Sequence, residues 1–150
     1  MSDKNLNAIF EEVNRNLAKK EFISAENNLK KILEKNPKNL KALFFLGSVY
    51  LELKQFENSK KLLNEVIELD PKIANAHNNL GVVYIKLRDF QKAKKCILKS
   101  LEINPKHLDA YNYLGLIYSE LGEFENATNI TKKSLELNEK FFPGYNNLGL

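Results

Sequence analysis

The stretch that decides the fold runs from residue 74 to residue 107 and reads ANAHNNLGVVYIKLRDFQKAKKCILKSLEINPKH. In its first half, one set of residues recurs every three or four positions, at Ala74, His77, Leu80, Gly81, Tyr84 and Leu87. In its second half the same kind of spacing recurs at Phe90, Ala93, Ile97, Ser100, Leu101 and Ile103, with lysines mostly on the opposite side. Such spacing places each set on one face of an α-helix. The stretch therefore predicts two packed helices, helix A over 74–87 and helix B over 90–103.

The same pattern returns every 34 residues along the chain. Leucine–glycine pairs occupy 46–47, 80–81, 114–115 and 148–149, and a tyrosine follows three residues after the first three glycines. Phenylalanine recurs at Phe22, Phe56, Phe90 and Phe124. A fixed period of this length is typical of arrays of helical repeats. We therefore expect a single domain, 1–150, made of repeats at about 6–39, 40–73, 74–107 and 108–141 and the first part of a fifth at 142–150.

Glycine and proline are expected to mark the contacts and ends of the helices. A glycine in a helix interior costs about 1 kcal/mol relative to alanine, so its return in each repeat predicts a close approach of helix A to helix B. The small residues expected on the other side are Ala25, Ser59, Ala93 and Ala127. Asn36-Pro37, Asp70-Pro71 and Asn104-Pro105 are expected to end helix B and to enter the first turn of the next helix. Glu139 stands where a fourth proline would be.

The run Leu43-x2-Leu46-Gly47-x2-Tyr50, followed by Ser59, Leu63 and Pro71, resembles the tetratricopeptide repeat, whose pattern has the same period. The resemblance covers about 6–150. It implies an all-α fold, a right-handed superhelical α-solenoid of antiparallel helix pairs. The first repeat departs from the pattern, with Glu12-Val13 where Leu-Gly is expected and Asn16 in place of tyrosine. Such divergence is typical of a terminal repeat.

The resemblance also implies a concave groove, lined by helix A of each repeat, in which a protein or peptide partner binds. The candidate partner-binding residues are Phe10, Asn14, Lys41, Phe44, Phe45, Ser48, Asn75, Asn78, Asn79, Val82, Asp109, Asn112, Tyr113, Leu116, Asn146 and Asn147. Several are asparagines, whose carboxamides can donate to and accept from an extended peptide backbone. Asparagines also occur off this face, at Asn27 and Asn58 for example, so composition explains part of the row.

Three functions remain open at this point. The first is a non-catalytic scaffold for protein–protein interaction. The second is the targeting arm of a larger enzyme, since the asparagines are similar to those lining the groove of glycosyltransferase-associated tetratricopeptide arrays. The third is a structural module that self-associates end to end through the unfinished C-terminal repeat. A carboxylate clamp of the kind that captures chaperone C-termini is not expected, because its positions hold Phe44 and Ser48, then Asn79, then Asp109 and Tyr113.

Composition and the titratable residues argue against several other functions. The net charge of +4 is spread along the chain, so nucleic acid is not an expected partner, and the apolar runs are too short to cross a membrane. One cysteine and no signal-like N-terminus favour the cytoplasm. His77 is expected in the core, His107 lacks companion metal ligands, and Cys96 is expected to be a small buried hydrophobe. We therefore expect no catalytic residue, no cofactor and no metal, and assign the lysine pairs of helix B to a solvated convex face.

Overall fold

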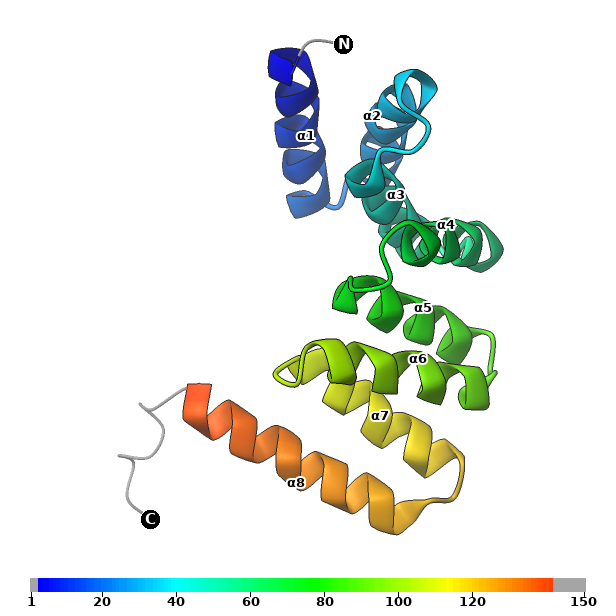
Figure 1. The fold of residues 1–150 in the computed structure, drawn as a ribbon, viewed down its shortest axis with the longest axis vertical. Helices are drawn as coiled ribbons and strands as arrows, with labels where there is room; N and C mark the ends of the chain where they lie inside the picture. The colour runs from blue at the N-terminus through cyan, green and yellow to red at the C-terminus, as the bar shows by residue number, and fades with distance from the viewer. Residues whose placement is uncertain (1–2, 142–150) are drawn as a thin grey trace. The chain divides into compact units, whose positions relative to one another are not determined.

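A computed structural model describes residues 3–141 of the chain, and the surroundings of side chains from residue 5 to residue 137. Within these residues it contains helices and turns and no strand, as the all-α prediction requires (Figure 1). The helices are α1 (Asp3–Ala18), α2 (Phe22–Lys35), α3 (Leu40–Glu52), α4 (Phe56–Leu69), α5 (Ala74–Lys86), α6 (Phe90–Ile103), α7 (Leu108–Glu120) and α8 (Phe124–Phe141). Odd-numbered helices are the helix A of each repeat and even-numbered helices are helix B. The prediction of an α-solenoid built from helix pairs is confirmed.

The chain divides into two compact units, residues 1–71 and residues 72–150. Unit 1 contains α1 to α4 and unit 2 contains α5 to α8, so each contains two helix pairs. The boundary follows Pro71, at the junction between the second and third repeats. Helices α3, α5 and α7 begin at Leu40, Ala74 and Leu108, the first residue of each repeat predicted from the 34-residue period.

Each unit has an apolar core built from both helices of its repeats. In unit 1 the core contains Phe10, Val13, Ala25, Leu29, Ile32, Ala42, Leu46, Val49 and Tyr50. In unit 2 it contains Ala93, Ile97, Ala110, Leu114 and Ile117. Helix B supplies its buried residues at intervals of four and three, because only one stripe of that helix faces its neighbours. In α6 these buried residues are Ala93, Ile97 and Ser100.

The glycines at two of the repeated positions, Gly47 and Gly81, lie at a tight contact between helix A and helix B. A methyl group added to Gly81 would lie 2.6 Å from Ile97 Cδ1 and 3.4 Å from the Ala93 carbonyl oxygen. At Gly47 the nearest atom would be Leu63 Cγ, at 3.1 Å. The prediction that a small residue of helix B lies opposite the glycine is confirmed at Ala93, whose carbonyl oxygen is within this contact. The nearest side chains, those of Ile97 and Leu63, belong to residues four positions later in helix B than Ala93 and Ser59.

Ser59 contributes to this contact in a different way. Its hydroxyl donates a hydrogen bond of 2.7 Å to the Gly47 carbonyl oxygen, and both residues are buried. In the first repeat a valine, Val13, replaces the glycine and is fully buried in the core of unit 1. In the first repeat, the Val13 side chain therefore occupies the position that a glycine holds in the later repeats.

The prolines lie in turns and not in helices. Pro37, Pro71 and Pro105 each precede the next helix by three residues, so the prediction that they enter its first turn is wrong. The first turn of α3 is instead capped by Asn39, whose side-chain oxygen accepts a hydrogen bond of 2.9 Å from the Ala42 amide. Proline still ends helix B, because the residue before a proline disfavours helical backbone.

The missing fourth proline has a visible consequence in α8. Helix α6 ends at Ile103, whose counterpart 34 residues later is Leu137. Helix α8 continues past that residue to Phe141. Glu139 can occupy a helix interior where Pro105 cannot, because glutamate retains its backbone N–H and does not clash with the preceding turn. The last described helix B is therefore the longest helix in the described part of the chain.

Gly81 and Gly115 occupy equivalent positions in one unit but have different surroundings, which gives a matched test of the helix contact. At Gly115 an added methyl group would meet only ordinary contacts, 3.4 Å from Ile130 Cγ2 and 3.5 Å from Thr131 Oγ1. Overpacking a core costs about 1–3 kcal/mol, whereas alanine gains about 1 kcal/mol over glycine in a helix. We expect Gly81→Ala to be less stable than Gly115→Ala by about 2 kcal/mol in urea unfolding followed by circular dichroism.

The same contact can be relieved from its other side. Ile97→Ala removes both Cδ1 and Cγ1, the two atoms that an added methyl group would meet at 2.6 and 2.7 Å, so in the Gly81→Ala background it should cost less stability than in the wild-type chain, where such a change costs about 2–5 kcal/mol. Equal stability of Gly81→Ala and Gly115→Ala, or an Ile97→Ala cost that does not depend on the background, would contradict the assignment of Ile97 as the obstacle.

Candidate functional site

Three phenylalanines and a lysine gather on the helix A side of unit 1. Phe10 comes from α1, and Lys41, Phe44 and Phe45 come from the first two turns of α3. The ring centroids of Phe10 and Phe45 lie 6.3 Å apart with the planes tilted by 49°. Those of Phe44 and Phe45 lie 5.8 Å apart with a tilt of 55°. These distances are within the range of favourable aromatic pairs. We call Phe10, Lys41, Phe44 and Phe45 the aromatic cluster.

Lys41 places its charge on the rings of this cluster. Its Nζ lies 4.3 Å from the centroid of Phe10 and 5.9 Å from that of Phe45. A cation at such distances from a ring face is attracted by the ring quadrupole, by about 0.5–1 kcal/mol at an exposed site. Lys41 is itself exposed, and among the described residues no ion pair includes it. The ammonium group is therefore held in place without a partner carboxylate in the described part of the chain.

The fold does not require aromatic residues at these positions. A shift of 34 residues carries Phe44 to Asn78 and Phe45 to Asn79, and a second shift carries them to Asn112 and Tyr113. The helix pairs of unit 2 form with these residues in place. Phe45 packs partly against the core of unit 1, but Asn79 and Tyr113 occupy the same place in unit 2. The aromatic cluster is thus particular to unit 1.

Unit 2 carries carboxamides on the corresponding face. Asn75 is exposed, Asn79 is half-buried, and Asn78 is buried. The Asn78 amide nitrogen lies 3.5 Å from the Asn79 side-chain oxygen, at the limit of a hydrogen bond, and the buried Asn78 oxygen has no partner among the described residues. The Asn112 oxygen accepts a hydrogen bond of 3.2 Å from the Ser134 hydroxyl of α8. The predicted row of asparagines is therefore not a row of equally accessible groups.

The predicted partner-binding residues differ widely in exposure. The side chains of Phe10, Asn78 and Val82 are only 6%, 6% and 7% exposed, so they offer a partner little surface. Exposed members are Asn14, Lys41, Asn75, Asp109, Asn112 and Leu116. Half-buried members are Phe44, Phe45, Ser48, Asn79 and Tyr113. Asn146 and Asn147 lie outside the described residues. The role of the predicted partner-binding residues in an interface stays a prediction. It applies mainly to the exposed and half-buried residues, because these offer a partner more surface.

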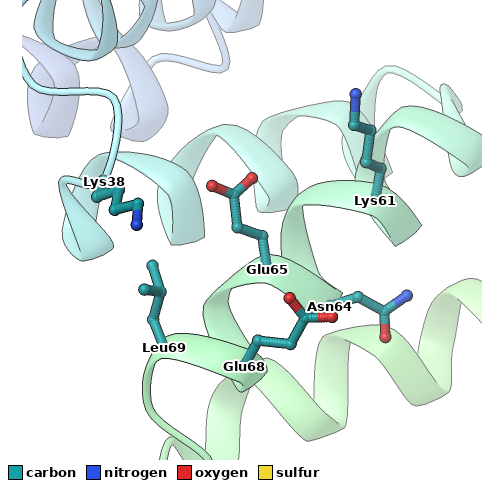
Figure 2. Close-up of a pocket in the computed structure, with 6 residues that line it drawn as sticks. All are labelled: Lys38, Lys61, Asn64, Glu65, Glu68 and Leu69. Atoms are coloured by element: carbon teal, nitrogen blue, oxygen red, sulfur yellow. The ribbon is translucent and has the colours of Figure 1, made fainter.

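A shallow pocket of about 520 Å³ lies elsewhere in unit 1 (Figure 2). Its lining residues come from the turn before α3 and from α4, and they are Lys38, Lys61, Asn64, Glu65, Glu68 and Leu69. Sequence periodicity did not single out these residues, because they lie on helix B and in a turn, outside the helix A positions. These lining residues contain no group of three metal-ligating side chains, as holds for all the residues that the structure describes.

The titratable residues considered from the sequence lie where core packing puts them. His77 is buried in α5, as predicted. His107 immediately precedes α7, and its Nε2 is buried without a hydrogen-bond partner among the described residues. No group of three metal-ligating side chains occurs in the described part of the chain. No helix of that part is long and apolar enough to cross a membrane.

Cys96 is half-buried on α6, and its surroundings suppress thiolate formation. Burial, with a smaller effect of the Asp89 carboxylate, raises the pKa of its thiol from 9.0 to about 11. The thiolate is the reactive form, so a shift of this size lowers its amount about 100-fold at pH 8 relative to an exposed thiol of ordinary pKa. We expect iodoacetamide to alkylate Cys96 about 100-fold more slowly in the folded chain than in the chain unfolded in urea. Similar rates in both states, followed by mass spectrometry, would contradict this.

Comparison with known proteins gives the family of the chain. Two family models described as the tetratricopeptide repeat match it, one over residues 16–78 and the other over residues 72–140. Together they span residues 16–140, which is more than half of the sequence. No curated protein matches the chain in a sequence comparison.

Solved structures with the same fold include a crystal structure of MamA, with 26% sequence identity and a TM-score of 0.77 over 89% of this chain and 78% of that one. MamA 41-end from Desulfovibrio magneticus RS-1 has 20% identity and a TM-score of 0.81, over 88% and 75% of the two chains. A mutant Thermobaculum terrenum O-GlcNAc transferase has 22% identity and a TM-score of 0.73, over 79% of this chain and 23% of the transferase. The last two show likeness of fold alone. With its 34-residue period, its helix pairs and both family models in agreement, the chain belongs to the tetratricopeptide repeat family.

Proposed function

We propose that this chain is a non-catalytic scaffold that binds a segment of a partner protein through the helix A faces of its repeats. One observation carries the proposal: the aromatic cluster gathers three large rings and a charged group on a face where the family fold itself accepts asparagine. Aromatic side chains supply much of the binding energy at protein interfaces, because each buries a large area and loses little conformational freedom. Membership of the tetratricopeptide family supports the scaffold role in general terms.

The carboxamides of unit 2 suit the same function. Asn75 and Asn112 are exposed, and each offers hydrogen-bond donors of the kind that hold an extended peptide backbone. Tyr113 and Leu116 on α7 add partly exposed apolar surface beside them.

We include in the proposal that the four repeats act as one domain and that the protein works in the cytoplasm. The unbroken 34-residue period supports the single domain. The single cysteine supports the cytoplasm, because it cannot form a disulfide within the chain.

A second candidate function is the targeting arm of a larger enzyme. The likeness to part of an O-GlcNAc transferase favours it, because this chain matches 23% of that protein's length and the rest of that protein lies outside the match. In that case the chain would still bind protein, and the catalysis would belong to a separate domain. Sequencing the parent reading frame beyond Leu150 discriminates: a stop codon there removes this candidate, and a catalytic domain in frame supports it.

Replacing anchor residues on the helix A faces should abolish partner capture. We expect Phe45→Ala/Asn79→Ala/Tyr113→Ala to lose the proteins that wild type retains from a cell extract, in a pull-down quantified by mass spectrometry. Loss of a few anchors typically weakens an interface by 2 kcal/mol or more, or about 30-fold. A matched control is Lys31→Ala/Lys95→Ala/Lys132→Ala, which changes exposed residues of helix B. Unchanged capture by the first variant, with its helical circular dichroism intact, would contradict the proposed surface.

A third candidate, end-to-end self-association, has its own structural support in α8. Phe124 and Leu135 are 70% and 57% exposed, and they lie eleven residues apart, close to three full turns, on one face of that helix. If this face mediates self-association, wild type should form dimers or larger species in concentration-dependent light scattering. Phe124→Glu/Leu135→Glu should then be monomeric, because a buried unpaired charge opposes the contact. A wild-type chain that stays monomeric at high concentration would remove this candidate.

A further inference from the structure

We propose that the aromatic cluster of unit 1 recognises an acidic side chain that stands next to a large apolar side chain in the partner segment. Lys41 is the group that selects the carboxylate, and Phe44 and Phe45 accept the apolar neighbour. This inference rests on the proposed function, since it assumes that the helix A face is the partner surface. It adds the chemical class of the partner and assigns it to one unit.

The apolar part of the site follows from the geometry of the rings. Phe10 is almost fully buried, so it forms the floor of the cluster, while Phe44 and Phe45 are half-buried. Phe45 packs against both other rings. The Phe44 backbone is fixed further, since its carbonyl oxygen accepts a hydrogen bond of 3.0 Å from the Ser48 hydroxyl. Rings anchored in this way present apolar surface at a fixed place, which lowers the entropy lost when a partner side chain binds there.

The charged part follows from the position of Lys41. An ammonium group has three N–H donors, and the rings below Lys41 attract its charge but offer no oxygen acceptor. No carboxylate of the described residues pairs with it. Because the cation is already held on the rings, a carboxylate from the partner can pair with it at little further cost in side-chain entropy. The neighbour of that carboxylate then lies over Phe44 and Phe45.

The counterparts of Lys41 explain why the site is confined to unit 1. They are Asn75 in α5 and Asp109 in α7, a neutral residue and an acidic one. An acidic partner residue is thus attracted at α3 and repelled at α7, so the charge assigns the acidic residue to unit 1. Glu11, the residue after Phe10, is exposed, and we expect its negative charge to weaken the positive potential beside the cluster. Its removal should strengthen the selection of acidic residues.

The test uses a random dodecapeptide display library panned against the full chain. Wild type should enrich peptides in which Asp or Glu lies within three positions of Trp, Phe or Leu. Lys41→Glu should enrich Lys or Arg in the same place, because the charge at the site is reversed. Lys31→Glu, on exposed helix B surface, makes the same change in net charge and should keep the acidic preference. Glu11→Gln should increase it.

Affinities can then be measured with the peptides themselves. The chain contains no tryptophan, so the fluorescence of a tryptophan-bearing peptide reports on the bound peptide alone. Lys41→Glu should weaken an acidic peptide at least about fivefold at low salt, the upper range for an exposed ion pair, and 1 M salt should remove most of the difference. Phe44→Asn, which places the residue of the equivalent α5 and α7 positions in α3, should also weaken it.

The outcomes separate this inference from the proposed function. Acidic enrichment that reverses in Lys41→Glu and persists in Lys31→Glu supports the inference. If selected peptides lose binding in Phe44→Asn but show no acidic preference, the helix A face remains the partner surface and the role of Lys41 is overturned. If Lys31→Glu acts like Lys41→Glu, net charge explains the selection and the site is overturned. If no selected peptide depends on Phe44 or Lys41, both the inference and the proposed surface on unit 1 fail.

Discussion

The close approach of helix A to helix B at a glycine is the contact on which the second and third repeats depend. At Gly81 there is no space for a methyl group, because Ile97 fills it. Alanine would improve the helix by about 1 kcal/mol, but the displaced core would cost more. Glycine therefore remains in spite of its low helix propensity. The branched side chains of helix B, Leu63 and Ile97, fill the space beside the glycines and are fully buried.

This contact also explains why the exposed face of helix A can vary from repeat to repeat. The core uses the positions of Leu46, Gly47 and Tyr50 in α3, and it leaves the positions of Lys41 and Phe44 mostly outside. Residues at those outer positions can change from lysine to aspartate, or from phenylalanine to asparagine, without disturbing the helix pair. The contact between helix A and helix B restricts the residues at its positions, whereas the exposed face of helix A is not restricted in this way. One fold can therefore have aromatic and cationic residues on this face in unit 1 and carboxamides in unit 2.

Helix α8 shows what happens when the constraint is relaxed at the last described repeat. Thr131 stands where α6 has the fully buried Ile97, and it is exposed. The smaller side chain leaves ordinary contact distances around Gly115. Proline is also absent, and the helix continues to Phe141. Polar residues at the core positions lie beside exposed Phe124 and Leu135, so the helix has features of a solvated end and of a contact surface at once.

The sequence alone determined the repeat, the helix pairs and the family, because these depend on periodic apolar residues and on backbone preferences, which are local and occur several times in the chain. It also predicted that His77 is buried in the core and that Lys41, Phe44 and Phe45 lie on helix A. The tertiary structure decided which side chain fills the space at each glycine, and it showed the prolines in turns. It alone showed that Phe10 and Asn78 are buried, that Ser134 engages Asn112, and that Lys41 lies over two rings. These features depend on the distances between side chains of different helices. Packing of the helices sets those distances, and the spacing of residues along one helix does not predict them.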